Sequence, residues 1–176
     1  TMTVVKQIEE VFVGRKGITR AEVRERALEI LRLVGINEPE RRYKQYPHEL
    51  SGGMKQRVVI AIALCCEPKL LLADEPTTAL DVTIQAQILN LMQDLQEQMG
   101  LTYIFITHDL SVVNHFADDI AVMYLGQMVE KAPSDVLFQN PVHPYTRALL
   151  SAIPLPIVGK EKPVRQLIRG EITSPV

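Results

Sequence analysis

The sequence lacks tryptophan, contains few aromatic residues and has only two cysteines. Because only 5% of its 176 residues are aromatic, stacking platforms for nucleic-acid bases are not expected. The net charge of −2 gives no general electrostatic basis for binding nucleic acid. The longest apolar run, residues 58–66, is far shorter than the roughly 20 residues that a membrane-spanning helix needs. These absences favour an ordinary globular protein whose membrane role, if it has one, comes through a partner.

The two cysteines are adjacent, and a common phosphate-binding loop is missing. Cys65 and Cys66 lie inside the apolar run, which predicts two small buried core residues in a reducing compartment. Two neighbouring thiols cannot supply a four-thiolate metal site. No Gly-x-x-x-x-Gly-Lys-Ser/Thr loop, which cradles nucleotide phosphates, occurs in the 176 residues. The sequence therefore offers no loop of this type to hold the phosphates of a nucleotide.

Apolar periodicity and capping residues predict alternating helices and strands. Thr19 opens a helix with a capping box, Ser51 caps another, and Gly100 ends a long amphipathic one. We expect helices at 3–12, 19–35, 51–66, 84–99, 110–117 and 144–153, and strands at 69–74, 101–107, 120–124 and 127–131. The first two strands are apolar runs typical of strands buried on both faces. This order predicts an α/β fold with parallel central strands.

Two segments are predicted to lie outside the core. Residues 39–47 are polar and basic, which is typical of a solvated connector. From Pro133 onward the composition changes, and six prolines fall between residues 133 and 163. We therefore interpret the end of the sequence as an appendage or docking tail.

Two adjacent carboxylates end the first predicted strand. Asp74 and Glu75 follow an apolar run, and His108 follows the next strand. Parallel strands joined by right-handed crossovers end at the same sheet edge, where ligands bind in open α/β sheets. One carboxylate can hold Mg²⁺ through its water shell, and the other can orient or deprotonate an attacking water. The alternatives are an acidic strand end at the surface and a structural histidine.

The segment Ser51-Gly52-Gly53 opens the helix that precedes this strand. Glycines allow a ligand to approach the backbone closely, and a helix start offers unpaired N–H groups to an anion. An ordinary serine cap followed by flexible glycines explains the same residues. The segment therefore predicts a phosphate contact only in combination with the carboxylates.

Four segments in this order resemble the motifs of ABC transporter ATP-binding subunits. They are the signature motif at 50–56, the Walker B strand and its following glutamate at 70–75, the D-loop at 78–81 and the switch histidine at 107–109. Residues 46–50 and 140–150 resemble the dipeptide and oligopeptide importer subfamily, whose pattern nickel and glutathione importers share. The resemblance covers essentially the whole sequence but only part of the family domain. The sequence is therefore expected to be a fragment without the Walker A region.

The resemblance implies a partial P-loop NTPase-type fold, with a parallel sheet flanked by helices. It places part of the ABC α-helical subdomain at residues 1–50 and the remainder of the catalytic core at 51–132. A Pro-rich C-terminal extension, characteristic of peptide importers, would occupy residues 133–176.

The resemblance also implies ATP and Mg²⁺ as cofactors, in a head-to-tail dimer over two ATP molecules. Asp74 would hold Mg²⁺, Glu75 would be the general base and His108 would contact the γ-phosphate. Asp81 would bridge the dimer seam. Four residues would serve the ATP held by the opposite subunit: Ser51, Gly52, Gly53 and Gln56.

The implied function is to energise uptake of dipeptides or oligopeptides from the cytoplasmic face of the plasma (inner) membrane, as a peripheral subunit. The implied partners are a second ABC ATPase subunit, identical or different, two membrane permease subunits and, indirectly, an extracytoplasmic solute-binding protein, but no nucleic acid. Open alternatives are a nickel or glutathione importer ATPase, and a non-catalytic module that lends its signature helix to a complete partner. An ABC protein acting on DNA or ribosomes is disfavoured by the Pro-rich tail and the mild negative charge.

Two expectations concern the isolated 176-residue polypeptide. It should lack ATPase activity, because it has no loop to hold the β- and γ-phosphates. It should also be marginally stable, aggregate or dimerise, because a sheet edge is left exposed.

Overall fold

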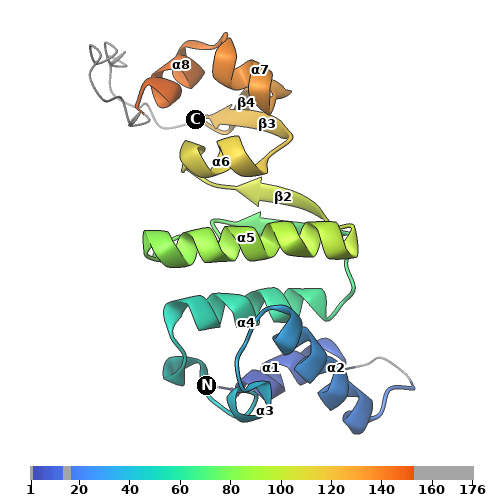
Figure 1. Ribbon diagram of the computed structural model, residues 1–176. Coiled ribbons are helices and arrows are strands. Elements are labelled where there is room, and N and C mark those ends of the chain that lie inside the picture. The colour runs from blue at the N-terminus through green and yellow to red at the C-terminus, as the bar shows by residue number, and fades with distance from the viewer. Residues whose placement is uncertain (1, 14–16, 153–176) are drawn as a thin grey trace. The chain divides into compact units, whose positions relative to one another are not determined.

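The structure is a computed structural model that describes residues 2–13 and 17–152, apart from the side chains of residues 111 and 115 (Figure 1). Its contacts divide the chain into two units, Thr1–Ile106 and Thr107–Val176, which are described separately. Among residues 2–13 and 17–152, no helix is both long enough and apolar enough to cross a membrane.

The first unit begins with a cluster of helices. These are α1 (Val4–Val11), α2 (Arg20–Leu33), α3 (Pro39–Arg42), the 3₁₀ helix η1 (Pro47–Glu49) and α4 (Gly52–Leu64). The predicted capping box is confirmed: Thr19 Oγ1 accepts from the Glu22 amide at 3.3 Å, and Glu22 Oε2 accepts from the Thr19 amide at 2.7 Å. Helices α1, α2 and α4 contact one another and bury Ile8, Leu31 and Leu64 almost completely.

The predicted connector at residues 39–47 is partly a structural element. Pro39 and Tyr43 are buried, and the Val4 and Val5 amides donate to the Gln45 and Tyr43 carbonyls, each at 2.9 Å. The expectation of a solvated connector is therefore wrong for Pro39 and Tyr43. The carbonyls of Gln45 and Tyr43 instead anchor the start of α1 through these two backbone hydrogen bonds.

A parallel pair of strands follows, with a long helix between them. Strands β1 (Leu70–Asp74) and β2 (Thr102–Ile106) pair in parallel, and α5 (Val82–Met99) connects them. As predicted, Gly100 ends α5, and it adopts the left-handed conformation with φ 64°. In the figure, α4 and α5 lie beside each other with their N-terminal ends on the same side (Figure 1). The predicted α/β class with parallel strands is confirmed.

The prediction that these strands are buried on both faces is wrong. Leu72 is 63% exposed and its partner in register, Ile104, is 49% exposed. Ala73, on the opposite face, is only 5% exposed. An apolar strand is buried on both faces only where other segments cover both faces of its sheet. The described residues of this unit cover only the face that carries Ala73.

The second unit is a hairpin packed with short helices. Its elements are α6 (Leu110–Phe116), β3 (Asp119–Tyr124), β4 (Gln127–Pro133), α7 (Ser134–Gln139) and α8 (Pro144–Ser151). The antiparallel strands turn at Leu125 and Gly126, whose φ values of 48° and 76° fit a tight hairpin turn. The predicted strand pair around Gly126 is confirmed.

The segment after residue 132 also contributes to the core. Leu137 of α7 is 0% exposed and packs with Ile120 and Val122 of β3. The expectation that everything from Pro133 onward lies outside the core is therefore wrong for Leu137. The prolines mark short helices here, because Pro144 occupies the first turn of α8.

The two cysteines differ in burial. Cys65 is 2% exposed and its thiol donates to the Ala61 carbonyl at 3.2 Å, whereas Cys66 is exposed. The prediction of two buried cysteines is wrong for Cys66, because α4 ends at Leu64 and the chain turns away.

Candidate nucleotide site

The N-terminal end of α4 carries the predicted phosphate-contacting residues. Ser51 is the N-cap, and its Oγ accepts from the Met54 amide at 3.4 Å. Gly52 is exposed and Gly53 is buried, so the two glycines have different surroundings. Gln56 follows Gly52 by one helical turn, which places both on the same face of α4. The helix start is therefore open to an anion along the side of Ser51, Gly52 and Gln56.

The carboxylate pair lies where β1 ends. Asp74 is the last residue of the strand, and Glu75 turns away from it with a left-handed φ of 44°. The Glu75 amide still donates to the Ile106 carbonyl at 2.9 Å, which fixes the turn to β2. Glu75 Oε2 accepts from the Thr78 hydroxyl at 2.9 Å. Both carboxylates are exposed, so solvent and ligands can reach them.

The start of α5 lies directly beside the start of α4. Asp81 is the N-cap of α5, and its Oδ1 accepts from the Ile84 amide at 2.9 Å. A Cβ atom added to Gly53 would lie 2.7 Å from Ile84 Cγ2. The structure therefore brings the predicted signature residues and Asp81 together.

The histidines fall into different settings. His108 lies in the second unit, so its predicted contact with the same nucleotide as Asp74 and Glu75 stays a prediction. His143 has a structural role, because its Nδ1 accepts from the Tyr145 amide at 3.2 Å and caps α8. His48 stacks against Tyr46 with ring centroids 5.5 Å apart.

The residues present fit both expected ligands. Across residues 2–13 and 17–152, no three metal-ligating side chains gather into one group. A single exposed carboxylate such as Asp74 nevertheless suits Mg²⁺, which keeps much of its water shell and binds substrate phosphates. The first amides of α4 have no partner inside their own helix, and the positive end of its dipole favours an anion.

Sequence reasoning missed two contacts in this region. The Thr78 hydroxyl that holds Glu75 has a faint signal, a hydroxyl residue three positions after the carboxylate. The packing of Ile84 against Gly53 has none, because it joins residues 31 positions apart on different helices.

An unpredicted carboxylate lies in the second unit. Glu130 Oε1 accepts from the Val142 amide at 2.8 Å, and Oε2 accepts from the His143 amide at 3.0 Å. The nearby Thr146 hydroxyl and then these amides hold the pKa of Glu130 below its usual range. Glu130 thus links β4 to the start of α8.

Comparison with protein families gives two matches along the chain. Residues 1–78 match the ABC transporter family, and residues 129–175 match the C-terminal region of oligopeptide/dipeptide transporters. The oligopeptide transport ATP-binding protein AppD of Bacillus subtilis is 52% identical over 174 residues, which are 99% of this chain and 52% of that protein. OppD of the same organism is 59% identical over 154 residues, 88% of this chain and 43% of that protein. The chain spans about half the length of the curated relatives it matches.

Solved structures agree with the fold. The structure of cbiO1 from Clostridium perfringens, described as part of an ABC transporter complex, matches with a TM-score of 0.69 at 32% identity. That match covers 80% of this chain and 54% of the other. A bacterial ABC transporter cassette solved as a dimer matches with a TM-score of 0.64 at 35% identity, covering 76% of this chain and 57% of the other.

Proposed function

Because this chain belongs to the ABC transporter family, we propose that it forms part of an ATP-binding and ATP-hydrolysing subunit that energises import of dipeptides or oligopeptides. The observation that carries the proposal is the presence of both matched regions in one chain. The first supports ATP chemistry. The second, together with relatives named for oligopeptide transport, supports peptides as the cargo.

The residues of this chain would divide their work between two nucleotides in a dimer. Asp74 would hold Mg²⁺ on the chain's own side, and the exposed Glu75 would orient and deprotonate the attacking water. His108 would contact the γ-phosphate of that nucleotide. The cofactor ion would neutralise charge on the phosphates. Glu75 is well suited to its role, because the left-handed turn and the Thr78 hydroxyl fix where its carboxylate lies.

The start of α4 would face the ATP of the opposite subunit. Ser51, Gly52 and Gly53 would present the open helix end to that γ-phosphate, and Gln56 would lie one turn behind. Asp81 would stand at the dimer seam. A structure of a related cassette described as bound to ADP and Pi, 34% identical with a TM-score of 0.63, supports nucleotide as the ligand class.

The same proposal assigns the partners and the location. The subunit would work with a second ABC ATPase subunit and two membrane permeases at the cytoplasmic face of the membrane. A solute-binding protein would deliver the peptide to the permeases. Closure of the dimer over ATP would then drive release of the peptide inward.

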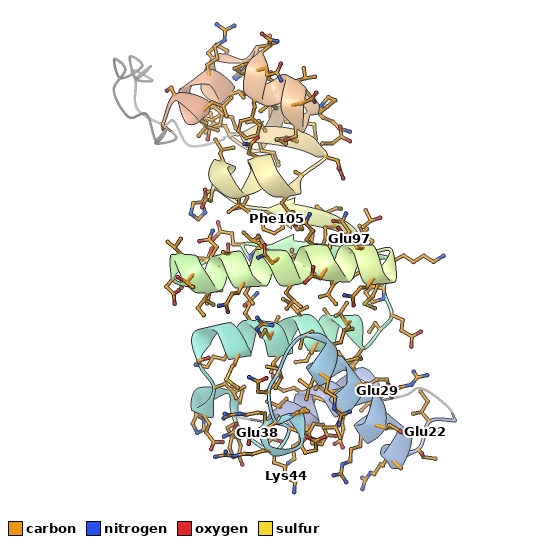
Figure 2. The ribbon with its side chains drawn as sticks, viewed as in Figure 1. Glu22, Glu29, Glu38, Lys44, Glu97 and Phe105 are labelled. Atoms are coloured by element: carbon orange, nitrogen blue, oxygen red, sulfur yellow. The ribbon has the colours of Figure 1, made fainter. Side chains whose placement is uncertain are left out.

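The test compares two glutamate variants in membrane vesicles that contain the assembled transporter. Glu75→Gln should abolish both ATP turnover and uptake of labelled peptide, because it removes the base. Glu97→Gln is the matched control, since Glu97 is an exposed residue on α5 (Figure 2). It should leave both activities unchanged.

Other results would redirect the proposal. Full turnover in Glu75→Gln would refute Glu75 as the base. Uptake of nickel or glutathione in place of peptide would refute the assigned cargo. The purified 176-residue polypeptide should show no magnesium-dependent turnover by itself, because its sequence contains no Gly-x-x-x-x-Gly-Lys-Ser/Thr loop.

A further inference from the structure

The two glycines at the start of α4 differ in what a side chain would meet. A Cβ added to Gly53 would lie 2.7 Å from Cγ2 of Ile84, 3.7 Å from its Cδ1 and 3.9 Å from its Cβ. The same addition to Gly52 would meet only Leu80 Cδ2, at 3.4 Å, which is an ordinary contact. Gly53 is therefore required by the packing of α4 on α5, whereas Gly52 is free of that constraint.

The Ile84 side chain cannot move away from a methyl group at residue 53 without an energetic cost. It is β-branched, and in a helix such side chains are restricted to essentially one χ1 rotamer. The atom that meets Gly53 is the Cγ2 methyl, which is attached directly to Cβ and has no further torsion. The Ile84 backbone is also fixed, because its amide donates to Asp81 Oδ1 at 2.9 Å.

We propose that Ile84 is a positioning residue for the segment Ser51–Gly53, seating its Cγ2 methyl in the space that Gly53 leaves. This contact sets the distance between the Ser51 cap of α4 and the Asp81 cap of α5. The inference deepens the proposed function and rests on it, because it gives the anion-facing end of α4 a fixed place beside the dimer seam. Gly53 is thus constrained by packing against α5, a constraint that Gly52 lacks, while the backbone of both glycines stays part of the anion-facing helix end.

The first experiment tests the contact alone, by thermal unfolding of the 176-residue chain. Gly53→Ala should lower Tm by roughly 2–12 °C, because the added methyl overpacks the gap. Adding Ile84→Leu should restore most of the loss, since leucine has no branch at Cβ and can keep its single Cγ away from residue 53. Adding Ile84→Val should not restore it, because valine retains both γ positions. Equal Tm values for the two double variants would overturn the contact.

The second experiment tests positioning, by ATP turnover of the assembled transporter at a temperature where every variant is folded. Ile84→Val keeps the methyl in the gap, so its kcat should stay within about two-fold of the parent. Ile84→Ala empties the gap, so its kcat should fall roughly ten-fold or more, because small misplacements at a reacting centre are costly. Equal kcat values for the valine and alanine variants would reduce Ile84 to a packing residue and overturn the inference.

The parent and Glu75→Gln transporters together separate this outcome from failure of the proposed function. Absence of ATP turnover in the parent transporter would overturn the proposed function and the positioning role with it, while the unfolding results would still report on the contact. Loss of turnover in Glu75→Gln, combined with equal activity of the Ile84→Val and Ile84→Ala transporters, would leave the proposed function standing and refute positioning alone.

Discussion

Replacing Glu130 by alanine should release the start of α8 from the hairpin of the second unit. The Glu130 carboxylate accepts from two consecutive amides, Val142 at 2.8 Å and His143 at 3.0 Å. His143 is itself the N-cap of α8, and both amides lie at least 12 residues from Glu130 in the sequence. These two bonds are therefore a tertiary link, and their loss should loosen α8 without unfolding the strands.

The magnitude follows from the type of hydrogen bond and its exposure. A hydrogen bond to a charged group contributes about 1.5–3 kcal/mol when it is shielded from water. Glu130 is only half-buried, so water can replace part of each bond, and we expect a total cost of about 1–2 kcal/mol. For a chain of this size that corresponds to a fall in Tm of roughly 2–8 °C.

The effect of Glu130 should depend on pH in one direction. The Thr146 hydroxyl and the Val142 amide hold the pKa of Glu130 below its usual range, so folding stabilises the carboxylate form. The contribution is present above the unfolded pKa of about 4.3 and is lost as the pH falls through the lower folded value. The difference in stability between the parent and Glu130→Gln should accordingly be full at neutral pH and disappear in acid.

The assay is thermal unfolding combined with hydrogen exchange at the Val142 and His143 amides. In Glu130→Ala both amides should exchange faster at neutral pH, whereas the β3–β4 amides should remain protected. The matched control is Glu97→Ala, which removes an exposed carboxylate from α5 in the other unit. Unchanged exchange at both Val142 and His143 in Glu130→Ala would refute the reasoning.

Two further predictions concern the first unit. Arg57→Met should lower the free energy of unfolding by about 1–3 kcal/mol, because Arg57 Nη1 donates to the Val34 carbonyl at 2.5 Å where α2 ends. Methionine keeps the apolar stem but cannot donate this hydrogen bond, so a denaturant midpoint equal to the parent's would contradict the prediction. Leu72→Ala should change the free energy of unfolding by less than about 1 kcal/mol because Leu72 is 63% exposed, whereas Leu95→Ala should lower it by about 2–5 kcal/mol because Leu95 is 1% exposed. Equal losses for the two variants in paired unfolding curves would show that the sheet face carrying Leu72 is covered in solution.

Helix boundaries were predictable from the sequence where a single residue determines the local backbone conformation. The capping box at Thr19, the cap at Ser51 and the helix end at Gly100 each depend on atoms within about four residues. Strand and helix types followed from periodicity, because the apolar runs on either side of α5 are too short for helices. The candidate site was likewise predicted from the order of its residues, and the chemical roles of those residues stay predictions.

Burial and tertiary fit could not be predicted in the same way. The apolar character of Leu72 predicts burial, but burial depends on which other segments cover the sheet face. Leu137 was missed because a Pro-rich composition says nothing of the hairpin on which its helix packs. The packing constraint on Gly53, which Gly52 lacks, depends on Ile84, and Ile84 lies beside Gly53 only after α4 and α5 have packed together.

The two strand pairs of the chain differ in how far apart along the sequence their partners lie. Tyr124 pairs with Gln127 across a two-residue turn, whereas Leu70 pairs with Thr102 only after all of α5 has been placed between them. Hairpins form in about 1–10 μs, but a pairing across a long connection must first overcome the entropy of closing that loop. The hairpin of the second unit can therefore be in place while β1 still lacks its partner. During refolding of the whole chain, the strand that carries Asp74 should therefore acquire its partner later than the strands of the hairpin do.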